Sequence, residues 1–271
     1  LTFVRTPNYE SPADADGNNT YIVNLIVTDN GSLTDSQTLT ITVTDVNEAP
    51  VITSNSGGST ASDSFAENST STVTTVASSD VDSGSSATYS KSGTDAADFS
   101  INSSSGVLTF ASTPNYESPA DDGTNNEYIV IVTVTDSGGN TDTQTITVTV
   151  TDVNEFTPVI TSNSGGSTAS ISFAENNTAA VTTVTSTDGD GTSTASYSIS
   201  GGTDAADFSI NSSSGALTFA STPNYESPAD DGTNNEYIVI VQVSDGSNTD
   251  TQTITVTVTD VNEFTPVITS N

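Results

Sequence analysis

The sequence predicts an all-β protein made of tandem seven-stranded Greek-key β-sandwiches in a linear array, and three observations lead to that prediction. Short motifs return at the spacing of a whole small domain, apolar residues alternate with polar ones along several segments, and turn residues separate those segments. Thr, Ser, Val and Ile dominate the composition, which favours short strands over helices. About seven short strands in each period, without helical periodicity, are typical of two packed sheets.

The repeat has the length of a domain rather than of a solenoid unit. PNYES begins at Pro7, Pro114 and Pro223, so its second copy starts 107 residues after the first and its third 109 residues after the second. DVNE, FAEN and PVITSN return at similar spacings. Solenoid repeats are about 20–50 residues long, whereas this period matches a small domain.

The positions of these motifs divide the chain into repeats. We expect the C-terminal half of one repeat at 1–48, complete repeats at 49–155 and 156–263, and the start of a further repeat at 264–271. A natural protein is not expected to begin and end within a domain. The chain is therefore expected to be part of a much longer array.

Strands are predicted where apolar residues occupy every second position. In the first complete repeat this alternation runs through 128–134 and 146–150, so one face of each strand is apolar. Shorter candidates, separated by turns rich in Gly, Ser, Asn and Asp, are 72–77, 87–92, 98–101 and 107–111. The residues expected to face the core are Phe65, Val73, Val76, Tyr89, Phe99, Ile101, Leu108, Phe110, Tyr116, Tyr128, Val130, Val132, Ile146 and Val148.

The charge of the chain excludes several classes of partner. The formal net charge is −32, and Arg5 and Lys91 are the only basic side chains. Such a surface cannot neutralise nucleic-acid phosphates and is repelled by anionic membranes. No apolar stretch approaches the ~18 residues of a membrane helix, so we expect neither a nucleic-acid partner nor membrane insertion of this segment. The carboxylates can attract hard divalent cations, unless they serve only to keep the protein soluble.

Catalysis is not expected from this set of residues. Cys and His are absent and Lys91 is the only lysine, so no Ser or Thr has a candidate base beside it. The lack of Cys also excludes disulfides. Paired carboxylates can hydrolyse glycosides, but every pair here falls at a junction between repeats, where a metal explains it better. The chain is therefore predicted not to be an enzyme.

Acidic residues gather where consecutive repeats are expected to meet. The linkers DVNEAP (45–50) and DVNEFTP (152–158) are so short that the last strand of one repeat runs almost directly into the next repeat. Carboxylates brought together there would repel one another, and two or three calcium ions would neutralise them and receive the oxygen ligands that they prefer. Zinc is disfavoured because Cys and His are absent. The acids expected at the second joint are Glu67, Glu117, Asp152, Glu155, Asp188, Asp190 and Asp245.

The motifs at these joints resemble those of the cadherin repeat, in which xEN, a motif ending in Glu, DxNDNxP, DxDxG and a strand-end Asp follow in that order. Here the order is AEN at 66–68, PNYE at 114–117, DVNEFTP at 152–158, DGDG at 188–191, and Asp245. The resemblance covers essentially the whole chain. It implies cadherin-like sandwiches with a short row of calcium ions between consecutive domains.

Carried over by position, the resemblance also implies the calcium ligands. At the second joint, the inner ions would be held by Glu67, Glu117, Asp152, Val153 through its carbonyl, Glu155 and Asp190. The outer ion there would be held by Asn154, Phe156 through its carbonyl, Asp188, Asp190 and Asp245. At the preceding joint the ligands would be Glu10, Asp45, Asn47, Glu48, Asp80, Asp82 and Asp136. Half of a further site would consist of Glu175, Glu226, Asp260, Asn262 and Glu263.

The chain departs from the family pattern in two places, and one loop is open to two interpretations. Asn8, Asn115 and Asn224 stand where the family has Asp, so the outermost ion on that side is predicted to be weak or absent. Glu replaces the last linker Asp at Glu48, Glu155 and Glu263, which lengthens that ligand by one methylene. The Asp- and Asn-rich loops 12–19 and 119–126 are either further calcium loops or solvated turns.

The expected function is mechanical or adhesive. The segment ADFSINSSSGVLTF (97–110) looks like the form of the repeat found in bacterial adhesins and other large surface proteins. The resemblance implies a calcium-rigidified spacer in a long extracellular or cell-surface fibre, whose partners are the neighbouring repeats and cell-surface glycans or proteins.

The alternative is a self-assembling filament or matrix protein, in which identical chains make lateral or homophilic contacts. It depends on isoleucines predicted on the outward face of one strand in every repeat, although Ile is also simply a good strand residue. These isoleucines are Ile22, Ile26, Ile129, Ile131, Ile238 and Ile240.

Overall fold

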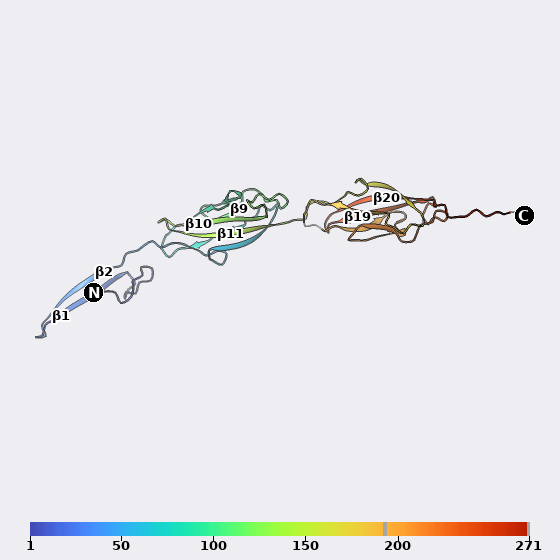
Figure 1. Cartoon of the computed structure of the whole chain (residues 1–271). Helices are drawn as coiled ribbons and strands as arrows, with labels where there is room; N and C mark the ends of the chain where they lie inside the picture. Colours follow the sequence, from blue (N-terminus) through green and yellow to red (C-terminus); the bar gives the residue numbers. More distant parts are fainter. Residues whose placement is uncertain (192–193, 270–271) are drawn as a thin grey trace. The chain divides into compact units, whose positions relative to one another are not determined.

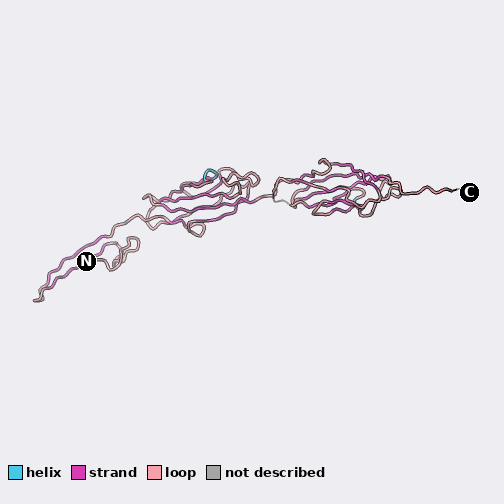
Figure 2. The backbone as a smooth tube through the Cα atoms, viewed as in Figure 1, coloured by secondary structure: helices cyan, strands magenta, loops and turns pink. Residues whose placement is uncertain are grey.

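The computed structural model describes residues 1–191 and 194–269. These residues fall into two compact units, Leu1–Thr151 and Asp152–Asn271, which are described one at a time below (Figure 1). Strands dominate both units, and the helical segments described are single 3-10 turns, η1 (Ala96–Asp98) and η2 (Ala205–Asp207) (Figure 2). Within the described part of the chain, no helix has the length and apolar character to cross a bilayer.

The first complete repeat, in the first unit, is a sandwich of two sheets. One sheet has the order β4 (Thr60–Ala66), β11 (Thr141–Thr151), β10 (Glu127–Thr135) and β7 (Thr88–Ser92). The other has the order β5 (Thr74–Thr75), β9 (Val107–Phe110) and β8 (Phe99–Ile101), and β3 (Val51–Ile52) pairs with β6 (Ser78–Ser79). Only β4 with β11 is a parallel pair among these strands. The predicted β-sandwich class is confirmed, with the first two strands each interrupted into two short pieces.

The second complete repeat, in the second unit, has the same topology. Its four-stranded sheet is β13 (Thr168–Ala174), β20 (Thr249–Thr259), β19 (Glu236–Ser244) and β16 (Ser196–Gly201), and its three-stranded sheet is β14 (Thr182–Thr183), β18 (Ala216–Phe219) and β17 (Phe208–Ile210). Here β12 (Val159–Ile160) pairs with β15 (Ser186–Thr187). One local difference is a β-bulge in β16 between Ile199 and Gly201. This extra residue accounts for one of the two residues by which the spacing of PNYES grows from 107 to 109, and the other lies in the linker, where Phe156 and Thr157 stand in place of Ala49 alone.

The half repeat contributes one hairpin to the first unit, β1 (Thr20–Thr28) and β2 (Thr34–Thr42). Leu25 and Val27 are 41% and 67% exposed, whereas the equivalent Val132 and Val134 of the first complete repeat are fully buried. Among the described residues this hairpin forms a sheet of two strands.

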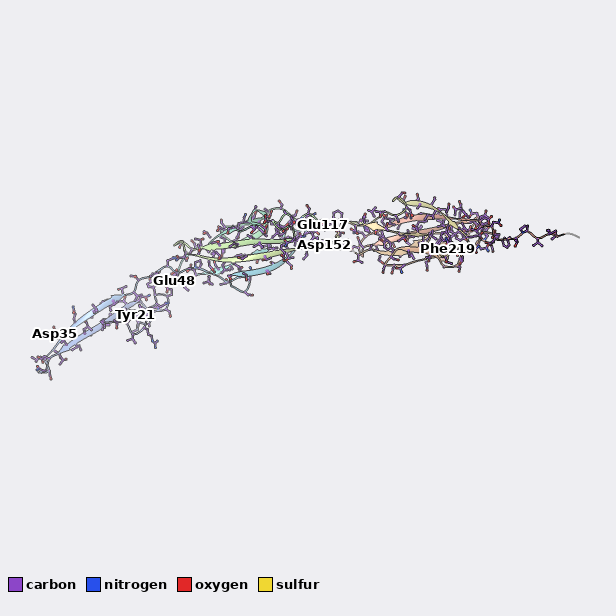
Figure 3. All side chains as sticks on the ribbon, viewed as in Figure 1. Tyr21, Asp35, Glu48, Glu117, Asp152 and Phe219 are labelled. Atoms are coloured by element: carbon purple, nitrogen blue, oxygen red, sulfur yellow. The ribbon has the colours of Figure 1, made fainter. Side chains whose placement is uncertain are left out.

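The core of each complete repeat consists of the inward residues that the alternation predicts. Most of the residues expected in the core of the first complete repeat are buried, and Ile101, Phe110 and Tyr116 are half-buried and pack against them. Ile52 on β3 belongs to this core as well, and no sequence pattern pointed to it. The aromatic residues pack in the same way in both repeats, and Phe219 (Figure 3) lies 4.5 Å from Phe208 and 5.1 Å from Tyr237 between ring centroids.

The first strand of each complete repeat is anchored by a carboxylate from the last strand. Asp142 accepts the backbone N–H of Ile52 at 2.8 Å, and Asp250 accepts that of Ile160 at 2.9 Å. Because Ile52 and Ile160 follow the linkers closely, these bonds fix the direction in which each linker enters its repeat. The linker itself is thereby held beside the loops that carry the acidic residues.

Candidate metal centres

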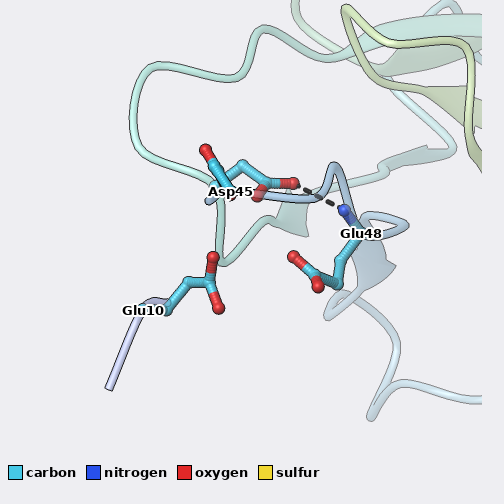
Figure 4. Close-up of side chains that lie close together, drawn as sticks. Glu10, Asp45 and Glu48 are labelled. Carbon is cyan, nitrogen blue, oxygen red and sulfur yellow. Dashed lines mark hydrogen bonds between the residues drawn. The ribbon is translucent and has the colours of Figure 1, made fainter. Parts of the chain in front are cut away.

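In the first unit, acidic side chains from the half repeat, the linker and the first complete repeat come together. Asp80 and Asp82 follow β6 and Asp136 follows β10, and each offers a carboxylate oxygen within 4.8 Å of the others. A second group, also within 4.8 Å, consists of Glu10, Asp45, Glu48 and Asp82. Figure 4 shows the Glu10 and Glu48 side chains turned toward one another, with Asp45 beside them. Asp82 belongs to both groups, so the two groups form a continuous acidic cluster.

Hydrogen bonds from the linker position this cluster. The backbone N–H of Glu48 donates to Asp82 at 2.9 Å (the dashed line in Figure 4), and the Asn47 side chain donates to Asp136 at 2.6 Å. Asn140, in the β10–β11 loop, donates from its side-chain amide to the carbonyls of Asn47 and Glu48, at 2.8 and 3.0 Å. Asn140 was not predicted as a site residue. The signal that could have found it is the Asn that closes the same loop in the next repeat, Asn248.

The second unit repeats the arrangement with its own residues. Asp188, Asp190 and Asp245 each offer a carboxylate oxygen within 4.8 Å of the others. Asp190 accepts the backbone N–H groups of Glu155 at 3.3 Å and Phe156 at 3.0 Å.

Asparagine side chains complete this arrangement in the second unit. Asn248 donates to the Phe156 carbonyl at 2.9 Å, and Asn154 donates to the Asp245 carbonyl at 3.5 Å. The linker residues predicted as ligands of the outer ion therefore lie against the predicted acids of the same repeat.

A pair of residues shapes this loop differently in the two repeats. A Cβ at Gly189 would lie 2.4 Å from the Phe156 ring, so only glycine leaves room for that ring. In the first complete repeat the equivalent positions are Val81 and Ala49, and Val81 is 62% exposed. The larger side chain of the pair is thus Phe156 on the linker in the second repeat and Val81 in the acidic turn in the first.

The opposite end of the second complete repeat carries another acidic group, Glu175, Glu226 and Asp260, whose oxygens lie within 4.8 Å of one another. Glu175 is 2% exposed and accepts the backbone N–H groups of Tyr225 at 2.7 Å and Val261 at 2.8 Å. The hydrogen bonds from Val261 and Tyr225 lower the pKa of the Glu175 carboxyl. Glu263 accepts a hydrogen bond from the Asn176 side chain at 2.5 Å, and Asn262 is exposed.

The same positions in the first complete repeat follow this pattern as far as the first unit contains them. Glu67 is 2% exposed and accepts the backbone N–H of Tyr116 at 2.7 Å. Glu117 directly follows Tyr116, and Asp152 directly follows the last residue of β11. The predicted joint site, which combines Glu67, Glu117, Asp152 and Val153 with Glu155 and Asp190, stays a prediction.

The fold and these motifs agree with comparisons to known proteins. The model of the cadherin domain family matches residues 62–151 and 169–259. The chain belongs to the cadherin domain family. No curated protein matches the sequence. Cadherin domains are adhesion or structural modules rather than enzymes, and they bind calcium in general.

Solved cadherin ectodomains share the fold at low sequence identity. Extracellular cadherin domains 3–6 of protocadherin gamma B2 match with a TM-score of 0.73 and 21% identity over 92% of this chain and 62% of that one. A cis-dimer structure of protocadherin gammaB7 EC3-6 matches with a TM-score of 0.71 and 23% identity over 91% and 62%. Drosophila N-cadherin EC1-4 matches with a TM-score of 0.60 and 22% identity over 83% and 52%. This cadherin chain thus spans less than two thirds of each of these structures.

The acidic groups of this cadherin chain fit a hard divalent cation. One oxygen each of Asp82, Asp188 and Asp245 is buried, and no hydrogen-bond donor reaches it from the described residues. Buried carboxylate oxygens normally have partners, and carboxylate, amide and carbonyl oxygens are the ligands of Ca²⁺. These three oxygens belong to the two acidic triads that also contain Asp80, Asp136 and Asp190.

The pKa shifts of these cadherin carboxylates reflect the same crowding. Desolvation, together with the charges of Glu10 and Asp82, raises the pKa of the Glu48 carboxyl above its ordinary value. Desolvation opposes the ionisation of Asp136, but hydrogen bonds from Asn47 and Asn140 outweigh it and lower the Asp136 pKa. Hydrogen bonds from Asn47 and Asn140 thus favour the ionised form of Asp136, whereas the charges of Glu10 and Asp82 disfavour the ionised form of Glu48.

The Asp-rich loop of the first cadherin repeat is a folded turn. Asp121 is 2% exposed and accepts the backbone N–H groups of Asn125 at 3.0 Å and Asn126 at 3.1 Å. Within the described residues, Asp121 and Asp122 belong to no group of three acids that could share an ion. The loop is thus a turn that closes around a buried carboxylate, and its interpretation as a further calcium loop stays a prediction.

Asparagine at the position where the family has Asp also has a structural role in this cadherin chain. The side-chain oxygen of Asn115 accepts the backbone N–H of Ser118 at 2.6 Å, and Asn8 and Asn224 accept those of Ser11 at 2.6 Å and Ser227 at 2.8 Å. The predicted weakening of the outermost ion stays a prediction.

Proposed function

We propose that this cadherin chain is a calcium-rigidified repeat segment of a long extracellular adhesin or surface fibre, in which it acts as a stiff spacer. Its units would be the complete repeats 49–155 and 156–263. The observation that supports the proposal most strongly is the acidic cluster of the first unit, because Glu10 and Asp45 come from the half repeat while Asp80, Asp82 and Asp136 come from the next repeat. A cation bound there joins two consecutive repeats.

The protein's own residues prepare the joint for that role. The N–H of Glu48 and the side chains of Asn47 and Asn140 hold the linker against the acidic loops, while repulsion among Glu10, Glu48 and Asp82 opposes their approach. Bound calcium would supply the positive charge that removes this repulsion. Because the ligands come from both repeats, their shared coordination restricts the motion of one repeat against the other.

The proposed surroundings follow from the same chemistry. Solved relatives are described as extracellular cadherin domains, and extracellular modules bind calcium at about 10⁻⁴–10⁻³ M. We place this chain outside the cell or on its surface, with neighbouring repeats as its first partners and cell-surface glycans or proteins as ligands of the larger protein. No nucleic-acid partner is expected, because the net charge is −32.

Calcium titration of the whole chain tests the proposal. We expect calcium to raise the melting temperature and to narrow the distribution of inter-repeat distances measured by small-angle X-ray scattering. Asp82→Asn should weaken both responses, because Asp82 belongs to two acidic groups. Asp122→Asn is the matched control, because this exposed acid lies in the same repeat outside those groups. Absence of any calcium response, or an equal response in both variants, contradicts the proposal.

A second candidate function is lateral assembly of identical chains. Ile129 and Ile238 are 40% and 37% exposed on the outward faces of β10 and β19, and one solved relative is described as a cis-dimer. Ile131 and Ile240 are half-buried rather than exposed, so the predicted pair is reduced to one isoleucine in each complete repeat. Ile129→Thr together with Ile238→Thr should abolish bundling if these residues form the contact, and should leave it unchanged if the chain is only a spacer.

A further inference from the structure

The four-stranded sheet of each complete repeat ends in a short edge strand, β4 in the first and β13 in the second. In the second repeat, Thr253 donates its N–H to the Ser167 carbonyl, and Glu175 donates its N–H to the Thr259 carbonyl. In a parallel ladder of this register, the odd-numbered residues of β13 face β20. The backbone N–H and C=O groups of the even-numbered residues, Thr168, Ser170, Ser172 and Ala174, therefore point away from the sheet.

The first complete repeat blocks this edge with a carboxylate. Asp63 lies on the inward face of β4, opposite Val148, and its Oδ1 accepts the backbone N–H of Ser64 at 2.9 Å. By the same register, the Ser64 N–H belongs to the outward row. An inward charge on an edge strand is a known device against edge-to-edge pairing. Asp63 occupies one edge donor and places a negative charge beside the others.

The second complete repeat lacks this device. Ile171 takes the position of Asp63, opposite Val256, and packs half-buried against the core. Among the hydrogen bonds of the described residues, none is donated by the backbone N–H of Ser170 or Ser172, whereas the equivalent Ser64 donates to Asp63. The whole strand, TASISFA, contains no charged residue, no Pro and no Gly. It is an unprotected edge of the kind that pairs with another strand.

We propose that the edge of β13 is a strand-addition site that pairs with β13 of a second copy of this chain, antiparallel and related by a two-fold axis. Two chains of net charge −32 repel one another, so contact between them is favoured where carboxylates are absent, and β13 supplies such a place on both partners. The opposite edge strand, β16, is interrupted by the bulge between Ile199 and Gly201, which disfavours pairing there. Pairing of β13 with β13 is isologous and therefore closes as a dimer.

This proposal does not depend on calcium, so its failure and that of the proposed function are distinguishable. Sedimentation equilibrium of the whole chain, with excess calcium and with a chelator, measures the weight-average mass over a range of concentrations. We expect the mass to rise from monomer to dimer in both conditions. Ile171→Asp, which installs the device of the first repeat, should abolish the rise. Ile199→Lys, which makes the other edge strand resemble the first repeat, is the matched control and should leave the dimer intact.

Two further variants keep the test decisive if Ile171→Asp weakens folding. Ser172→Pro removes one outward N–H without touching the ladder to β20 and should also abolish the dimer. Asp63→Ile should free the β4 edge and raise the mass beyond the dimer. Hydrogen exchange should show the Ser172 N–H protected in a concentration-dependent manner, while the Ser62 N–H stays unprotected. A native chain that stays monomeric, or a dimer that survives both Ile171→Asp and Ser172→Pro, overturns the proposal.

Discussion

The two complete repeats have the same strands in the same order, but they differ at the borders of their four-stranded sheets. On the inward face of the edge strands, the first repeat has Asp63 and Lys91 and the second has Ile171 and Ile199. All four side chains are half-buried, so they are close enough to solvent for a charge and close enough to the core for an isoleucine. The Lys91 ammonium donates a hydrogen bond to the Ala96 carbonyl. The fold therefore constrains these positions less than it constrains the core. The edge strands have charged side chains at these positions in the first repeat and isoleucines in the second.

The second difference concerns backbone geometry. The bulge in β16 moves the following glycine toward β19: a Cβ at Gly202 would lie 2.3 Å from the Ile238 carbonyl oxygen, whereas one at Gly93 would lie 3.2 Å from the nearest atom, the Ile131 nitrogen. Both glycines have a φ of 109°, which any other residue rarely adopts. Glycine is required at Gly93 mainly by the backbone conformation, and the inserted residue adds a steric requirement for glycine at Gly202.

The largest effect that separates the repeats should come from these glycines. Gly202→Ala should destabilise the second repeat by about 3–4 kcal/mol, because backbone strain and a backbone clash add, and Gly93→Ala should destabilise the first by about 1–2 kcal/mol, mainly through strain with a tight contact to the Ile131 nitrogen. Hydrogen exchange of the β10 and β19 amides measures the stability of each repeat.

Gly106 and Gly215 provide the control, because a Cβ at either would lie 2.1 Å from a backbone oxygen, that of Val76 or Val184. Alanine at these two positions should give equal losses in the two repeats. Equal losses for Gly93→Ala and Gly202→Ala would show that the bulge is accommodated without crowding.

The edge residues should have the next largest effect. Ile171→Asp should destabilise the second repeat by about 2 kcal/mol, because it replaces a half-buried apolar side chain by a charge, and Asp63→Ile should stabilise the first by about 1 kcal/mol. Denaturant unfolding, followed at concentrations where the chain is monomeric, checks both values. Loss of stability in Asp63→Ile would mean that the hydrogen bond from Ser64 to Asp63 contributes more to the free energy of unfolding than burial of the isoleucine side chain does.

The loop that faces the linker offers a smaller test of the same comparison. Gly189→Val gives the second repeat the turn residue of the first and should displace the Phe156 ring, with a loss of about 1 kcal/mol. Adding Phe156→Ala to Gly189→Val should recover the lost stability, because the first repeat combines Ala49 with Val81. A double-mutant cycle measures the coupling. Additive effects of the two substitutions would show that ring and glycine are independent.

The regular parts of this molecule could be predicted from the sequence because they depend on local patterns. Period-two alternation predicted the long strands β10 and β11 and the residues that they bury, and the spacing of PNYES predicted the repeat. The short strands β3 and β6 were not predicted correctly, because two residues contain no period. Ile52 is buried through its pairing with β6 and its bond to Asp142, neither of which is local in sequence.

The candidate site divides in the same way. The acids of the first unit were predicted from motifs, and the structure brings Asp80, Asp82 and Asp136 together. Asn140 and Gly189 were missed, because their importance depends on contacts with the linker across about 90 or 35 residues of sequence, which no short motif encodes. Buried Asp95 was missed for a similar reason, since it accepts the backbone N–H groups of Asp122 and Ile129, which lie 27 and 34 residues further along the chain.

The smallest predicted effect concerns two equivalent carboxylates, Asp98 in the first repeat and Asp207 in the second, of which only Asp98 has a lysine nearby. Burial, together with the charges of Asp204 and Asp230, raises the pKa of Asp207 above its ordinary value of 3.8. Burial and the charges of Asp95 and Asp121 raise the pKa of Asp98 as well, but there Lys91 opposes the shift. The ionised form of Asp207 therefore has no nearby cation among the described residues, because Ile199 stands where Lys91 stands in the first repeat.

The sign of the resulting pH dependence follows from the direction of the shift. A carboxyl with a raised pKa binds its proton more tightly in the folded state, so its contribution to stability is complete below pH 3.8 and is lost as the pH rises through the raised value. Asp207→Asn should therefore stabilise the second repeat at neutral pH by about 0.5 kcal/mol, since the group is partly solvated, and the gain should vanish in acid. Asp98→Asn should give a smaller gain unless Lys91→Ile is introduced with it. Unfolding measured from acidic to neutral pH checks this, and equal gains for Asp98→Asn and Asp207→Asn would show that Lys91 does not compensate Asp98.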